Sequence, residues 1–332
     1  MARLTTVARI LTGLLFVCAA TAQLPRVGNI NFYGLHATLP DQILTAAHLG
    51  PGDTLPASRI DLEDRIIGLP GVMDANVQSV CCDGDRATLF IGIQERGQAG
   101  IEFRVPPSGT ATLPAELMTR YRKYSGALMR SEVKGGAADT SVHREEEYFR
   151  LYTASHTLKL RAVLRTGPDA EQRAAAVTVL ACATNKRLVV DDLLFALLDS
   201  DDGVRAAALR QLATIAALAH QRPSLGIRIP PAGMVDLLNS VVLSDRVEAT
   251  KTLLALTAKP DNAALDLIRE RALPSLAEMA RWQTRSYAEA PFQLLARIAG
   301  LRDEDAIASW EHGDPEPVIQ QALDSARKPG LQ

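Results

Sequence analysis

Apolar residues recur every three or four positions over most of the second half of the chain, which is the periodicity of helices that bury one face. The clearest case is the stretch 201–219, where Val204, Ala208, Leu212 and Ile215 share one face behind an acidic start. Acidic residues at this end complement the helix dipole. The pattern predicts a first helix that begins near residue 145 and ends at 167–169. Further helices are predicted over 169–184, 188–199, 201–220, 232–243, 245–258, 262–281, 287–300 and 315–327.

These helices show signs of internal repetition. The run Arg-Ala-Ala-Ala at 173–176 recurs at 205–208, a spacing of 32, and Val-Glu-Ala at 247–249 lies 43 positions after Val-Arg-Ala at 204–206. Helix pairs recurring at about 30 to 45 residues are typical of an α-solenoid. The motif Asp202-x-Val204-Arg205-x-Ala207-Ala208-x-x-x-Leu212 resembles the second-helix core of a HEAT repeat. This resemblance implies an all-α HEAT-like solenoid over 145–327, in which Asp202 and Arg205 tie neighbouring repeats. The alternative fold is a non-repetitive helical bundle.

A different pattern precedes the helices. Alternating apolar residues predict strands over 27–32, 74–82 and 86–95, and helical patterns cover 41–49 and 58–68. Asp83-Gly84-Asp85 is a strong hairpin signal between the last two strands. The predicted fold class is therefore a small α+β module of order β-α-α-β-β, followed by the helical solenoid.

Four short motifs occur in this module in the order Ile30-x-Phe32-x-Gly34-Leu35, Gly52-Asp53-x-Leu55, Leu69-Pro70-Gly71-Val72-x-x-Ala75-x-Val77 and Leu89-x-Ile91-x-Ile93-x-Glu95. These motifs, in this order, resemble those of a POTRA domain of the FtsQ type. The resemblance covers 25–97. It implies a peptide- or protein-binding module outside the cytoplasm, in which a sheet edge pairs with a strand of a partner.

Residues 98–144 are rich in Gly, Pro, Ser and Thr, as linkers are. Within this linker the pattern predicts one helix over 114–129. We expect this helix to dock on the solenoid and cover its first repeat, because end repeats leave an apolar face open.

The first residues predict a secretion signal over 1–22. Arg3 and Arg9 precede the uncharged run Ile10–Ala22, which ends in Ala20-Thr21-Ala22. Cleavage there would make the mature protein periplasmic or secreted, with no bilayer-spanning segment left. The alternative is an uncleaved Ile10–Ala22 segment that anchors the chain in the inner membrane.

Charge and cysteine content narrow the function classes. The 36 basic and 38 acidic residues are near balance, which gives no electrostatic basis for nucleic-acid binding. Cys81, Cys82 and Cys182 are an odd set outside the signal, and adjacent cysteines rarely bond each other. We expect one of the adjacent pair to be a small buried apolar residue.

Catalytic motifs are missing from the sequence. None of the six histidines pairs with another at helical spacing, and neither a G-x-S-x-G nor a Walker-type motif occurs. Asp199, Asp201 and Asp202 are interpreted as helix-capping residues and not as a calcium site. We predict no enzyme activity, no catalytic or metal-ligating residues and no cofactor.

The sequence therefore predicts a non-catalytic extracytoplasmic scaffold. Its sheet edge and its concave solenoid face would each bind a protein partner of the cell envelope, and peripheral association with an outer-membrane protein is one form of this. Candidate contact residues are Arg222, Arg228 and Ile229, expected to be exposed in the loop 220–231, and Trp282 and Tyr287, which fill either the terminal core or a binding surface. The alternatives are an inner-membrane-anchored envelope or division factor of the FtsQ type and, third, a helical-repeat enzyme.

Overall fold

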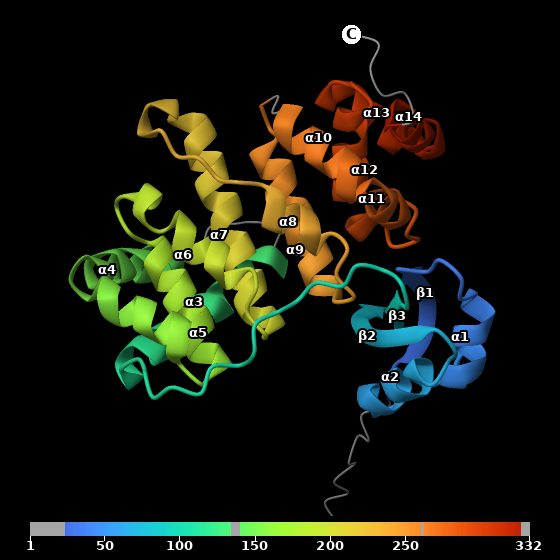
Figure 1. Cartoon of the computed structure of the whole chain (residues 1–332), viewed down its shortest axis with the longest axis horizontal. Coiled ribbons are helices and arrows are strands. Elements are labelled where there is room, and N and C mark those ends of the chain that lie inside the picture. The colour runs from blue at the N-terminus through green and yellow to red at the C-terminus, as the bar shows by residue number, and fades with distance from the viewer. Residues whose placement is uncertain (1–23, 134–139, 260–261, 327–332) are drawn as a thin grey trace, which may run out of the picture.

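The chain forms a small three-stranded α/β module followed by a mostly helical array (Figure 1). The structure is a computed structural model that describes residues 24–133, 140–259 and 262–326. The module contains β1 (Arg26–Tyr33), α1 (Pro40–Ala47), α2 (Arg59–Ile67), β2 (Val72–Asp83) and β3 (Arg86–Glu95). This confirms the predicted order β-α-α-β-β.

The sheet of the module has the order β1-β3-β2, with β1 parallel and β2 antiparallel to the central β3. Gly84 has a φ of +63° in the tight turn between β2 and β3, which confirms the predicted hairpin. Helices α1 and α2 cover one face of the sheet, where Ile43 and Ile66 pack against Leu89 and Ile91. The opposite face carries Tyr33 and Phe90, which belong to the core of the array.

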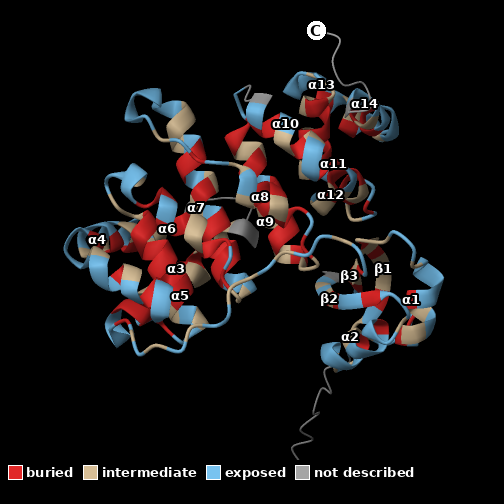
Figure 2. Cartoon of the chain, viewed as in Figure 1, coloured by how far each residue is buried: buried red, intermediate tan, exposed pale blue. Residues whose placement is uncertain are grey.

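The array stacks its helices so that one continuous core runs through them (Figure 2). Its helices are α3 (Ala115–Val133), α4 (Thr140–Thr166), α5 (Ala170–Ala181), α6 (Val190–Ala196), α7 (Asp202–Gln221), α8 (Ala232–Leu237), α9 (Leu243–Leu256), α10 (Asn262–Arg271), α11 (Leu273–Ala280), α12 (Arg285–Ile298), α13 (Asp303–His312) and α14 (Glu316–Ala326).

Two of the sequence predictions for the last third are corrected here. The single helix expected over 262–281 is broken at Ala272, whose φ of −140° is not helical. Pro274 follows in the first turn of α11, and a proline cannot donate the hydrogen bond that would continue α10. α13 was absent from the predicted set, since only Ala306 and Trp310 are buried along it and the apolar period is weak.

Buried ion pairs connect successive helices of the array. Arg173 in α5 forms two hydrogen bonds of 2.8 and 2.9 Å with Asp199, and Arg205 in α7 forms two of 2.8 Å with Asp245 in α9. All four side chains are at most 4% exposed. Each arginine also donates to two carbonyl groups of the turn that precedes its own helix. The repeated geometry supports the predicted role of Arg205 as a tie between helices.

The third arginine that connects successive helices is not at the position that the comparison of 247–249 with 204–206 indicates. Arg246, in the first turns of α9, donates to the carbonyl of Ser240 and pairs with Glu278 in α11 at 3.3 Å. Arg246 and not Glu248 is thus the counterpart of Arg205. The sequence alignment, based on the run at 247–249, was displaced because valine and alanine recur too often in such helices to fix the register.

Two of the three acidic residues before α7 have the structural roles expected of them. Asp201 accepts a hydrogen bond from the backbone N–H of Val204 and so caps α7. Asp202 accepts one from the hydroxyl of Ser244 at the start of α9, at 3.2 Å, and so links the two helices. Asp199, also interpreted as a capping residue, is instead the buried partner of Arg173.

Residues 98–114 connect the module to α3 and cross the array as an extended segment, which we call the strap (Figure 1). The backbone N–H of Arg104 donates to the carbonyl of Leu198 at 2.9 Å, and that of Leu113 to the side chain of Gln172 at 2.7 Å. The guanidinium of Arg104 lies 3.5 Å from the ring centre of Phe195. The strap is therefore attached to the array at Arg104 and at Leu113, although its composition is that of a flexible linker.

The helix α3 packs on α4 and α5, as the sequence led us to expect. Leu117 and Tyr124 are buried in this contact, and Arg122 forms a two-pronged ion pair with Glu171 in α5. α3 thus occupies part of the face that the first repeats would otherwise leave open.

The structure describes two of the three cysteines outside the predicted signal. Cys81 is exposed and disulfide-bonded, so it is not the buried member that the sequence predicts for the adjacent pair. The side chain of Cys82 lies outside the described part of the structure. Cys182 is a free thiol, and burial raises its pKa to about 12. Such a thiol is protonated and unreactive near neutral pH.

Candidate functional site: the cleft between module and array

The open face of the module sheet docks on the array through a cluster of aromatic side chains. The ring of Trp282 lies 5.6 Å from that of Tyr33 and 5.0 Å from that of Phe90, centre to centre. Tyr287 contacts Phe90 from α12, also at 5.0 Å. Edge-on and tilted contacts of this kind stabilise a packed interface beyond the area that they bury. This cluster holds β1 and β3 against the α11–α12 turn.

Hydrogen bonds fix the register of the same contact. The side chain of Asn31 accepts from the backbone N–H of Gln283 at 2.9 Å and donates to the hydroxyl of Thr284 at 3.2 Å. The indole N–H of Trp282 donates to the carbonyl of Phe32 at 3.4 Å. Asn31 is only 4% exposed, so these bonds satisfy a polar group that would otherwise be buried at a cost.

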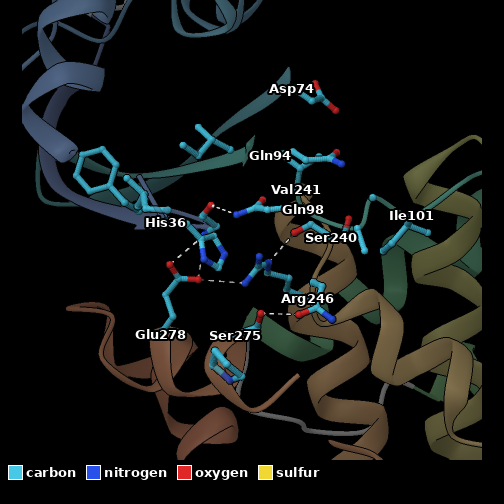
Figure 3. Close-up of a pocket in the computed structure, with 18 of the residues that line it drawn as sticks. His36, Asp74, Gln94, Gln98, Ile101, Ser240, Val241, Arg246, Ser275 and Glu278 are labelled. Carbon is cyan, nitrogen blue, oxygen red and sulfur yellow. Dashed lines mark hydrogen bonds and ion pairs between the residues drawn. The ribbon is translucent and has the colours of Figure 1, made fainter. Parts of the chain in front are cut away.

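A charged group completes the junction (Figure 3). Both carboxylate oxygens of Glu278 lie 3.0 Å from the backbone nitrogen of Gly34, and one is paired with Arg246. Arg246 stands over the ring of Tyr33, whose hydroxyl donates to the carbonyl of Val241 at 2.9 Å. Burial raises the pKa of Glu278, an effect that Arg246 and the Gly34 N–H oppose. The array thus presents a carboxylate to the end of β1.

The backbones meet most closely at Gly92 in β3. A Cβ atom placed there would lie 2.2 Å from the Tyr33 ring and 2.5 Å from the carbonyl oxygen of Val241. No side chain fits at this distance, so glycine is required for the module to dock.

We therefore expect Gly92→Ala to open the junction and to lower the free energy of unfolding by about 1–3 kcal/mol, the usual cost of overpacking. Urea unfolding measures the loss, and a red shift of tryptophan emission reports exposure of Trp282. The control is Gly50→Ala, whose Cβ would make an ordinary contact of 3.6 Å with Asp53. Equal stability and emission of the two variants would contradict this account.

Beside the junction lies an open cleft of about 1020 Å³ between the module and the array (Figure 3). Its module wall is formed by the end of β1, the end of β3 and the first part of the strap. Its array wall is formed by the turn before α9, by α11 and by the α11–α12 turn. Half-buried apolar residues line it together with polar groups; the apolar ones are Ile30, Phe32, Leu35, Ile101 and Phe103.

The outer edge of β1 is covered along most of its length. Its first half is bonded to the segment before α2: Val27 donates to Asp53, and Leu55 donates to Pro25. Its second half faces Trp282, which donates to Phe32. A partner strand therefore finds little unpaired backbone on β1.

The other edge of the sheet, β2, is protected by carboxylates. The N–H of Val77 donates to Glu63 of α2 at 2.8 Å, and that of Ala75 donates to the side chain of Asp74 at 2.8 Å. Acidic groups on an edge strand are a known protection against unwanted strand pairing. The outer edge of β1 is thus engaged along most of its length, and on β2 the N–H groups of Ala75 and Val77 are engaged by carboxylates.

The structure separates the predicted contact residues into three groups. Ile229, expected to be exposed, is 8% exposed and joins the core of the array, because the loop folds back before α8. Trp282 and Tyr287 belong to the core of the array, one of the two places expected for them, and from there they also contact Phe90 of the module. Arg222 and Arg228 are exposed as predicted.

The two arginines lie at a projecting end of the array. α7 has 20 residues and is longer than α5 and α9, which have 12 and 14. Its last turns and the short 3-10 turn Pro223–Leu225 therefore project from the helix stack (Figure 1). Leu225 is 41% exposed between Arg222 and Arg228. This tip combines an apolar side chain with two cations and is a second candidate contact surface.

Sequence reasoning missed Asn31, Glu278 and Arg246 as junction residues. Asn31 and Gln283 are 252 positions apart, and no local pattern connects them. The one available signal was Asn31 itself, a polar residue within an apolar strand.

Among the described residues there is no group of three or more His, Cys, Asp or Glu side chains placed to hold a metal ion. The helices of this part of the chain include none with both the length and the apolar character needed to cross a bilayer.

Comparison with known proteins gives little further. No family model and no curated protein matches the chain. Among solved structures, a designed armadillo repeat protein is similar over 64% of this chain and 97% of its own length, with 15% identical residues and a TM-score of 0.34. The helical array is defined by its own helices and its continuous core, described above.

Proposed function

We propose that the protein is a non-catalytic scaffold that binds protein partners outside the cytoplasm, holding a POTRA-like module and a HEAT-like array in one fixed arrangement. The observation that carries this proposal is the junction. An aromatic cluster, a buried asparagine and a glutamate–arginine pair join the two parts, and the strap is bonded to the array at Arg104 and Leu113. Such an arrangement presents surfaces on both parts at a constant spacing.

The projecting tip at Arg222, Leu225 and Arg228 is the surface we assign to a partner of the array. It replaces the concave face as our first choice, because it combines an exposed apolar side chain with two exposed cations. An exposed leucine between two arginines suits a partner with an apolar anchor and acidic neighbours.

The test uses the full chain in its native cells with a photo-crosslinking residue at Leu225, and a control at Ile307, which is 47% exposed on α13. We expect discrete adducts from Leu225 and none from Ile307. The adducts should disappear when Arg222 and Arg228 are both changed to alanine, while the melting temperature stays the same. Adducts that are equal at both positions, or that survive the double change, would count against the tip as a contact surface.

The extracytoplasmic location rests on the signal-like segment 1–22, which is outside the described residues. N-terminal sequencing of the protein from native cells tests it directly. A start at Gln23 supports a periplasmic or secreted protein. A start at residue 1 or 2 would favour the alternative, an inner-membrane-anchored factor of the FtsQ type. The helical-repeat enzyme remains a third alternative; stoichiometric zinc or iron in the purified protein would favour it.

A further inference from the structure

The strap contains an unpaired stretch where it borders the cleft. At one end the N–H of Gln98 donates to the carbonyl of Glu95 at 3.2 Å, and at the other the N–H of Arg104 donates to Leu198. Between them, the backbone groups of Ala99 to Phe103 make no hydrogen bond to any described residue. The stretch is therefore anchored at both ends and leaves a short row of donors and acceptors free.

The side chains around this stretch divide it into two sides. Ile101 and Phe103 turn towards the array and are partly buried against its core, and Phe103 packs under the guanidinium of Arg205 at 3.9 Å. Ala99, Gly100 and Glu102 are exposed. The cleft opens beside them and is lined on its module wall by Ile30 and Leu35.

We propose that an extended segment of a protein partner binds in this cleft by pairing its backbone with Ala99 to Phe103. The proposal rests on the scaffold function proposed above and names the kind of partner and the place where it binds. β1 is covered, and the carboxylates of Glu63 and Asp74 occupy the N–H groups of Val77 and Ala75 in β2, whereas no backbone group from Ala99 to Phe103 is bonded to a described residue. Pairing of this kind draws affinity from main-chain hydrogen bonds and specificity from side-chain pockets.

The occupant is a peptide of about the same length as the unpaired stretch, because paired extended chains advance together by about 3.3 Å per residue. Its side chains alternate between the two faces. One set contacts Ile30, Leu35 and Ile101, so every second residue is apolar. The other set faces solvent and is polar.

The test uses a synthetic peptide selected from a random library for binding to the full chain, in an ordinary form and in a form N-methylated at alternate residues. N-methylation removes amide hydrogens and keeps the side chains. We expect it to weaken binding about tenfold or more, as the loss of one or two backbone hydrogen bonds does. Isothermal calorimetry measures both forms.

The matched protein variants are Glu102→Pro and Val105→Pro. Each removes one N–H from the strap, but Glu102 lies within the unpaired stretch from Ala99 to Phe103, whereas Val105, 86% exposed, lies outside it. We expect Glu102→Pro to weaken the ordinary peptide about tenfold and Val105→Pro to leave it within about twofold. Thermal melting shows that both variants are folded.

Equal binding of both peptide forms, or equal effects of both prolines, would overturn the strap as the binding edge. So would a library that yields no binding peptide, or self-association of the chain that Glu102→Pro abolishes, since a second copy would then be the occupant. The scaffold proposal stands or falls separately on the crosslinks at Leu225, which do not involve the strap.

Discussion

Replacing Asp245 with alanine should lower the free energy of unfolding by about 3–5 kcal/mol, the usual result of leaving one member of a buried ion pair without its partner. Arg205 is 2% exposed and Asp245 is fully buried. Arg205 would keep its bonds to the carbonyls of Asp199 and Ser200 but lose its counter-charge. The hydroxyl of Ser240, 2.7 Å from Asp245, would lose its acceptor as well. Urea unfolding at neutral pH measures the change.

The double variant Arg205→Met with Asp245→Leu should recover most of the loss, because it removes both charges and keeps the volume. Asp305→Ala is the surface control: the carboxylate pairs with Arg302 in solvent, and its loss should leave the free energy of unfolding nearly unchanged. If the double variant were as unstable as the single one, the stability would come from the hydrogen bonds at this site and not from the charge balance.

Glu95→Gln is expected to be nearly as damaging, by about 2–3 kcal/mol at neutral pH. The carboxylate of Glu95, 6% exposed at the end of β3, accepts from the backbone N–H groups of His36, Ala37 and Thr38 at 2.8 to 3.1 Å. Burial by itself raises the pKa of Glu95, but these three donors outweigh it and lower the pKa to about 2. Glutamine offers one oxygen in place of two and adds an NH₂ group among donors.

The pH dependence follows from the direction of that shift. Glu95 has an ordinary pKa of 4.5 in the unfolded chain and about 2 in the folded one. Its contribution is therefore complete above pH 4.5 and is lost as the pH falls towards 2. Wild-type protein should lose stability over this interval more steeply than Glu95→Gln. Glu311→Gln, an exposed substitution on α13, should follow the wild type. Parallel curves for wild type and Glu95→Gln would show that this carboxylate does not titrate as proposed.

The elements of the fold could be predicted from sequence because their signals are local. The alternation in β3, the hairpin at Gly84 and the apolar period of α7 each depend on residues a few positions apart. The prediction of one helix over 262–281 was wrong for a local reason too, because Pro274 ends α10 and begins α11. Where a signal was weak, as in α13, no helix was predicted.

The site could not be predicted in the same way. Trp282 and Tyr287 were recognised as unusual aromatic residues, but their partners Tyr33 and Phe90 lie in the module at the other end of the chain. The composition of the strap indicated a flexible linker, because a high content of Pro and Gly does not indicate whether the segment packs on another part of the protein. Its contacts come from Leu198 and Phe195, which belong to the array.

By itself, the sequence determined the order of elements, the acidic cap of α7 and the role of Arg205 as a tie between helices, because short-range periodicity and capping chemistry fix them. Only the tertiary structure decided that the two parts form one unit, that Arg246 is the next arginine in the series, that the edge of β1 is covered and that the strap borders the cleft. The physical reason is that docking depends on the shape and the polar groups of two surfaces together. Glycine is required at position 92 because the module there approaches the carbonyl of Val241, and this requirement arises only when the module docks on the array.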